Sequence, residues 1–86
     1  MLHNLMFHHV DKSAGFQKFI EKKVASIQRK FSNLQNIKMN LEKVGHDFMF
    51  KMILERYGRP IVIHSVDHSP YRAASKVFSK ASALRN

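Results

Sequence analysis

Basic side chains in two segments of the sequence have the number and spacing needed to bind a polyanion. Residues 14–31 contain five lysines and arginines and a single acid, Glu21, while residues 70–84 contain three basic residues and no acid. The three in the second segment are four residues apart, which places them on one face of a helix. The candidate nucleic-acid-binding residues are Lys18, Lys22, Lys23, Arg29, Lys30, Arg72, Lys76 and Lys80. Cations that neutralise phosphates release condensed counterions, and this release is the main source of sequence-independent nucleic-acid affinity.

The overall charge agrees with this interpretation. The 86 residues include 15 Lys and Arg against 6 Asp and Glu, for a net charge of +9 and a pI near 10.3. On a domain of this size the excess favours a polyanionic partner, with nucleic acid ahead of an anionic membrane. An ordinary solvated basic face is the alternative, but the near absence of acids beside these cations favours RNA contact.

The remaining polar residues give little support for a metal site or a cofactor. His8 and His9 are adjacent, so on a strand they would point to opposite sides, and no histidine spacing in the chain resembles a zinc site. Cysteine is absent, which excludes thiolate ligands and disulfides and fits a reducing compartment. The sequence predicts no metal and no cofactor.

Hydroxyl, carboxylate and imidazole groups cluster once, at Ser65, Asp67, His68 and Ser69. A nucleophile with an acid and a histidine could do catalytic chemistry. However, Ser69 before Pro70 is a strong helix start, because the hydroxyl caps a free N–H and the proline has none to leave unpaired. Asp67 suits a turn. The sequence therefore predicts no catalytic residue and no enzyme.

The apolar pattern predicts the elements that position these side chains. Strands are expected at residues 2–7, 37–42, 48–55 and 61–66, with turns at 43–47 and 57–60. One helix is expected from a cap at Ser13 to a stop at Ser32 and Asn33, and a second from Ser69. Their apolar sides are Phe16, Phe19, Ile20, Val24, Ile27 and Phe31 in the first helix and Ala74, Val77, Phe78, Ala81 and Leu84 in the second.

The order β-α-β-β-β-α predicts an α+β fold in a single domain over residues 1–86. A right-handed crossover makes the first two strands parallel, and short turns make the later strands antiparallel neighbours. Both helices are expected on one face of a four-stranded mixed sheet. Their basic sides then face outward, because burying an unpaired ammonium group is costly.

The other face of the sheet is expected to carry Met49, Ile53, Val62 and Val66. Such a patch is either a surface for a partner or for self-association, or a modest exposure typical of small sheets. Tyr71 either stacks on a base or packs at the helix start. No apolar run approaches the ~20 residues that a membrane span needs, and the first residues lack the features of a secretory signal. A cytoplasmic protein without a membrane partner is expected.

Three stretches carry a resemblance to a known family: His8-His9-Val10, the segment from Phe19 to Phe31, and Gly58-x-x-Ile61 through Asp67 to Tyr71-x-Ala73-Ala74. With the element order, they resemble the ribosome hibernation-promoting factor and ribosome-associated inhibitor family. The resemblance implies a fold similar to double-stranded-RNA-binding domains. It also implies binding to rRNA of the small ribosomal subunit, where mRNA and tRNA would bind, and silencing of translation under stress or in stationary phase.

Individual residues match or depart from the family pattern. Lys23 and Lys80 fall where the family has basic residues, and Tyr71 matches the tyrosine of its Tyr-Ala-Ala segment. Phe7 stands where the family usually has glycine, and Arg72 replaces an alanine. Ser75 replaces an aspartate, and the lysine-rich tail and the second domain of other members are missing. The chain is therefore identified as a divergent short member.

Two hypotheses follow from the sequence. In the first, the protein binds the small ribosomal subunit through its basic helix faces and blocks the mRNA and tRNA sites without chemistry. In the second, it is a protein-interaction or self-association module that uses the apolar face of the sheet.

Overall fold

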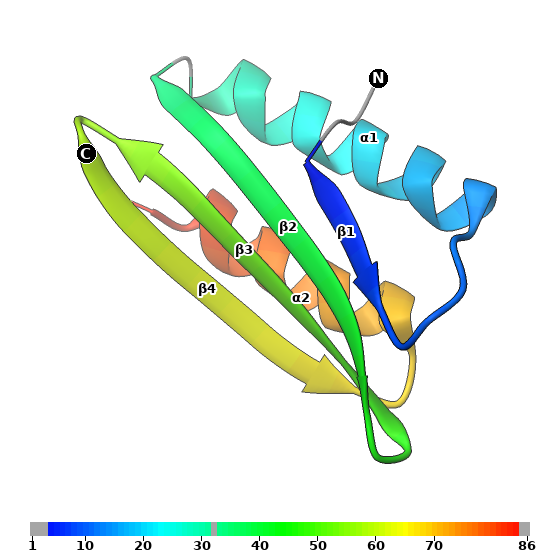
Figure 1. Ribbon diagram of the computed structural model, residues 1–86. Coiled ribbons are helices and arrows are strands. Elements are labelled where there is room, and N and C mark those ends of the chain that lie inside the picture. The colour runs from blue at the N-terminus through cyan, green and yellow to red at the C-terminus, as the bar shows by residue number, and fades with distance from the viewer. Residues whose placement is uncertain (1–3, 32, 85–86) are drawn as a thin grey trace.

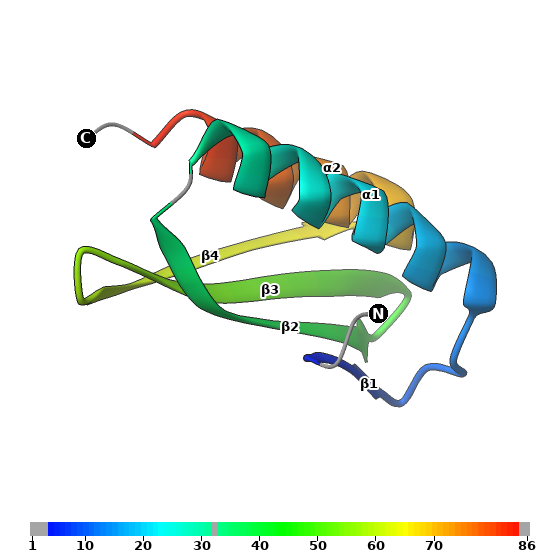
Figure 2. The same cartoon turned by 90° about the horizontal axis from the view of Figure 1, so that it is seen from above.

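The computed structural model describes residues 4–31 and 33–84. Its elements are β1 (Leu5–His8), α1 (Ala14–Lys30), β2 (Leu34–Val44), β3 (Asp47–Arg56), β4 (Arg59–Asp67) and α2 (Pro70–Ser82). The strands form a four-stranded sheet in the order β1-β2-β3-β4, with β1 parallel to β2 and the other pairs antiparallel. Both helices lie side by side on one face of the sheet (Figures 1 and 2). The predicted fold class, strand directions and layer arrangement are confirmed.

Serine caps begin both helices, as predicted. The backbone N–H of Phe16 donates to Ser13 Oγ at 3.2 Å, and that of Arg72 donates to Ser69 Oγ at 3.4 Å. The end of α1 was placed too late by the sequence pattern. The helix ends at Lys30, and Phe31 is already extended while its N–H still donates to Ile27 at 2.8 Å. Ser32 lies outside the described residues.

The core lies between the helix layer and the inner face of the sheet. Phe16 and Phe78 pack against Phe50 of the central strand β3, with ring centroids 6.1 and 6.0 Å apart. The buried helix residues are Phe16, Ile20, Ile27, Ala73, Ala74, Val77, Phe78 and Ala81. Phe19, Val24 and Phe31, on the predicted apolar side of α1, pack against the core at its margin and are partly buried.

Two hairpin turns are shorter than the sequence suggested. The turn between β3 and β4 consists of Tyr57 and Gly58 alone. Their φ angles are 56° and 75°, and two consecutive positive φ values match the twist of a two-residue hairpin. β4 therefore begins at Arg59 and not at residue 61. Pro60 lies inside the strand, which is acceptable because β4 is at the edge of the sheet.

Two strand starts also differ from the prediction. β2 begins at Leu34, three residues early, because a bulge between Gln35 and Lys38, with Asn36 at φ 53°, interrupts the alternation that revealed the rest of the strand. β1 covers Leu5–His8 where residues 2–7 were expected. Leu2, the predicted first residue of that strand, lies outside the described residues.

Candidate nucleic-acid interface

The cations of α1 fall into two groups. Lys18, Lys22 and Arg29 are separated by four and seven residues, so they form one stripe along the helix, and all three are exposed. None of them makes a hydrogen bond, ion pair or ring contact with the part of the chain that the structure describes. We call these three residues the α1 stripe. They are available to an external anion without breaking any contact within the fold.

The other two α1 cations lie on the flank that faces α2. Lys30 Nζ donates to the carbonyl oxygen of Ser82 at 2.7 Å and lies 5.5 Å from the ring centre of Phe31. Lys23 Nζ lies 5.5 Å from the ring centre of Phe19. The sequence predicted both side chains correctly as outward-pointing residues, but it did not show that Lys30 ties the ends of the two helices together.

The cations of α2 lie against the edge strand β4. Arg72 Nε is 3.3 Å from Asp67 Oδ1, and Lys76 Nζ is 2.9 Å from Asp67 Oδ2. Lys76 Nζ also donates to the carbonyl of Val66 at 3.5 Å, and Lys80 Nζ donates to that of His64 at 3.3 Å. We call Arg72, Lys76 and Lys80 the α2 row. All three keep exposed side chains, so they remain accessible while they hold the helix to the strand.

Asp67 organises the α2 row. Its carboxylate also accepts from the backbone N–H of Ser69 at 3.1 Å. The pKa of Asp67 is lowered to about 2, first by the hydrogen bond from Lys76 and then by the hydrogen bond from the Ser69 N–H. The positive charges of Lys76 and Arg72 lower it further. Sequence reasoning missed this role. The sequence indicated only a turn residue at Asp67. The cations reach its carboxylate because α2 packs beside the end of β4.

The α2 row also covers an open sheet edge. β4 has a neighbour only on the β3 side, and the contacts from Lys76 and Lys80 to its carbonyls are solvent exposed. Charged side chains that cover a sheet edge discourage its pairing with a strand of another molecule. The α2 row therefore has a structural role in addition to any role in binding.

The α1 stripe and the α2 row do not merge into one cluster. Tyr71 and Ser82 contact α1, whereas the α2 row contacts β4, so this row lies on the side of α2 away from α1. A shallow groove of about 510 Å³ runs along α2, and its lining residues are Arg72, Ser75, Lys76, Ser79 and Lys80. The predicted cationic surface thus consists of two parallel rows on one helical layer.

An aromatic cluster joins the two helix starts. The Tyr71 ring packs edge-on against Phe16 and Phe19 at centroid distances of 5.3 and 5.1 Å. A Cβ at Gly15 would lie 3.5 Å from the Tyr71 hydroxyl oxygen, an ordinary van der Waals contact, so this packing does not require glycine there. Of the two roles predicted for Tyr71, packing is therefore observed, but 42% of the residue stays exposed.

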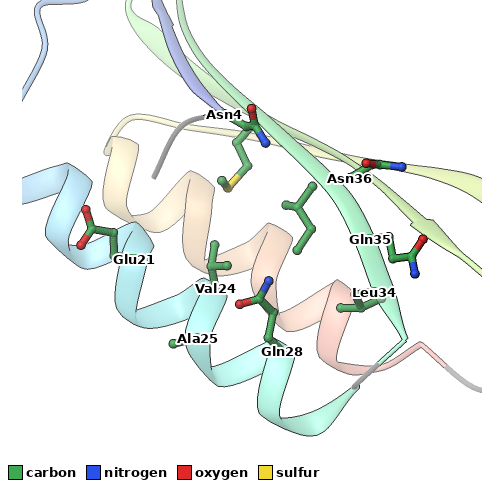
Figure 3. Close-up of a pocket in the computed structure, with 10 residues that line it drawn as sticks. Asn4, Glu21, Val24, Ala25, Gln28, Leu34, Gln35 and Asn36 are labelled. Carbon is green, nitrogen blue, oxygen red and sulfur yellow. The ribbon is translucent and has the colours of Figure 1, made fainter. Parts of the chain in front are cut away.

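A groove of about 570 Å³ lies between α1 and β2. Figure 3 shows Glu21, Val24, Ala25 and Gln28 of α1 on one side of it and Leu34, Gln35 and Asn36 of β2 on the other. It holds the single acid of α1, and no lysine or arginine lines it. This groove is not suited to a phosphate backbone.

The other chemistries considered for the sequence can be compared with the structure. Within residues 4–31 and 33–84, no three histidine, aspartate or glutamate side chains gather closely enough to hold a metal ion. In the suspected catalytic cluster, Asp67 pairs with the α2 row, Ser69 caps α2, and His68 Nδ1 contacts Asp47. Over the same residues, neither helix is long and apolar enough to cross a membrane.

Comparisons with known proteins bear on the fold. No protein-family model and no curated protein matches the sequence. Among solved structures, a ribosomal subunit interface protein from Coxiella burnetii has a TM-score of 0.84 at 18% identity, over 92% of this chain and 87% of its own. The N-terminal domain of Protein Y from Thermus thermophilus has a TM-score of 0.82 at 17% identity, over 94% and 90%. These names match the hibernation-factor family that the sequence resembles, and the chain has the fold of both structures.

Proposed function

We propose that this protein binds the small ribosomal subunit through rRNA and silences translation by occupying the sites of mRNA and tRNA. The observation that carries the proposal is the α1 stripe, three exposed cations with no internal partner among the described residues. The fold supports it, because a protein named for the ribosomal subunit interface shares it across most of both chains.

The α1 stripe supplies the principal phosphate contacts. Each of its cations can neutralise a phosphate and release counterions without losing a contact within the protein. The α2 row is the secondary contact, since Arg72 and Lys76 are partly neutralised by Asp67. The exposed part of Tyr71 packs beside Phe19, over whose ring Lys23 Nζ lies, and a flipped or single-stranded base can stack there.

Silencing in this proposal is steric and requires no catalytic residue or cofactor. A compact domain of 36 × 23 × 17 Å placed on the subunit excludes other ligands from the volume that it fills. The proposed setting is the cytoplasm of stressed or stationary cells, where ribosomes are idle.

Cosedimentation with purified small subunits in sucrose gradients tests the proposal. At low salt the protein should travel with the subunit, and at high salt it should remain at the top, because phosphate contacts weaken steeply with salt. Substituting Lys18, Lys22 and Arg29 by glutamate should release the protein at low salt. As a matched control, replacing Lys38 on the far side of the sheet by glutamate should have little effect. A triple variant that is folded and still travels with the subunit would exclude the α1 stripe as the contact.

A further inference from the structure

The face of the sheet away from the helices carries an apolar patch that the proposed function does not use. Met6, Val62 and Val66 are 58%, 54% and 44% exposed. Met49 and Ile53, at neighbouring positions, are half-buried. The register pairs Ile53 with Val62 and Met49 with Val66, so two apolar cross-strand pairs lie on this face over β3 and β4, on either side of the pair Lys51–His64.

The charges on this face are balanced, unlike those of the helices. The outward positions of β2 and β3 carry Lys38 and Lys51 against Glu42 and Glu55. The two helices carry eight basic residues and one acid. The outer face of the sheet is therefore the part of this +9 chain where a second molecule of the same charge meets the least repulsion.

The face is also large enough for a stable contact. The two longer dimensions of the molecule are 36 and 23 Å, an outline of roughly the size of the ~800 Å² that each partner contributes to a standard protein interface, so such a contact would use most of this face. Two sheets that pack face to face bring alternate side chains of each strand into the contact, and on β3 and β4 these include Met49, Ile53, Val62 and Val66.

The outer face of the sheet also has a hollow and a buried polar atom without a hydrogen-bond partner among the described residues. The hollow, of about 420 Å³, lies on this face over β1, β2 and β3, and its lining includes Met6, Lys38, Asn40, Lys51 and Ile53. Asn40 Oδ1 is buried and has no hydrogen-bond partner in the part of the chain that the structure describes. An unsatisfied buried acceptor is costly, so a donor from a docked molecule would stabilise the complex.

We propose that a second copy of this chain docks on this face, sheet against sheet. A two-fold axis that runs along the strands and lies over β2 and β3 would place β4 of each copy over the hollow of the other. Val62 would then enter the hollow, and Lys51 would face Asn40 across the axis. Edge-to-edge pairing through β4 is disfavoured by Lys76 and Lys80, and face-to-face pairing leaves both helix layers directed outward.

Self-association through this face and binding to RNA should respond to salt in opposite directions. Repulsion between two +9 chains weakens as ionic strength rises and the Debye length falls below ~10 Å. Burial of apolar side chains is not screened in this way. Self-association should therefore hold or strengthen with salt, whereas binding to a phosphate backbone weakens.

Sedimentation equilibrium of the nucleic-acid-free chain tests the proposal, from low micromolar to near millimolar protein, at low and high salt. The wild type should approach the mass of a dimer with rising concentration, more so at high salt. Val62→Lys should raise the dissociation constant of the dimer by at least ~10-fold, because the two-fold symmetry buries the change twice. Ser79→Lys adds the same charge on the exposed side of α2 and should dimerise like the wild type.

Circular dichroism of each variant shows that it is folded. If Val62→Lys does not fold, Met6→Lys makes the same test from the other side of the face. A wild type that stays monomeric throughout the concentration range would overturn the proposal, even if the face were later found to bind another protein. A folded Val62→Lys variant that dimerises like the wild type would overturn it as well.

Discussion

The two cation rows should differ in how they contribute to RNA affinity, because only one is free of internal contacts. Replacing the α1 stripe, Lys18, Lys22 and Arg29, by glutamine keeps the helix propensity and removes three positive charges. Each lost phosphate contact lowers the slope of log K against log salt by about 0.7–0.9, so the slope should fall by roughly 2 to 3.

The α2 row provides a matched control with the same change in charge. Replacing Arg72, Lys76 and Lys80 by glutamine should lower the slope less, because two of these cations already neutralise Asp67. The same change should lower the melting temperature, since it removes the contacts between α2 and β4 and leaves the Asp67 carboxylate without its cations. The α1 variant should melt like the wild type, as exposed unpaired cations contribute little to stability.

Titration of the protein with small subunits or a structured RNA over a salt series gives the slopes, and thermal unfolding followed by circular dichroism gives the melting temperatures. A larger loss of slope in the α2 variant than in the α1 variant, with both melting temperatures unchanged, would refute the assignment of the rows.

Three further predictions concern stability and are measured by urea unfolding. Phe78→Ala should lower the free energy of unfolding by ~3–5 kcal/mol, and Phe19→Ala clearly less, because Phe78 is buried against Phe50 and Phe19 is only partly buried; equal losses would contradict the packing. Gly58→Ala should be destabilising by ~1–2 kcal/mol, because φ is 75° there, whereas Gly15→Ala should be neutral or stabilising; the reverse order would contradict the turn geometry. The pKa of Asp67 is lowered from 3.8 to about 2 on folding, so its carboxylate stabilises the fold above the higher value and loses that effect as pH falls to the lower one. The stability difference between wild type and Asp67→Asn should shrink across this range, and a constant difference would contradict the ion pairs.

Local sequence signals predicted most of the fold. Ser13 and Ser69 cap the helices through contacts three residues away, so the sequence alone was sufficient. The alternation in β2 revealed the strand only up to the bulge at Asn36, where the period of two is interrupted. Helical spacing identified the apolar side of α1. How deeply each residue on that side is buried depends on the sheet beneath, so the partial burial of Phe19 became visible only in the structure.

The candidate site was predicted as a set of cations but not in its arrangement. Sequence spacing showed that Arg72, Lys76 and Lys80 share a face. It could not show that this face lies over the edge of β4, because that depends on how α2 packs against the sheet. For the same reason the role of Asp67 and the separation of the α2 row from the α1 stripe became visible only in three dimensions.

The central claim is that the protein occupies the mRNA and tRNA sites of the small ribosomal subunit. Binding of a fluorescent mRNA to purified small subunits, measured with increasing amounts of the protein, tests it most directly. The apparent dissociation constant of the mRNA should rise in proportion to the protein concentration, and the glutamate variant of Lys18, Lys22 and Arg29 should leave it unchanged. A ternary complex, in which protein and mRNA bind the same subunit with undiminished affinity, would contradict the claim.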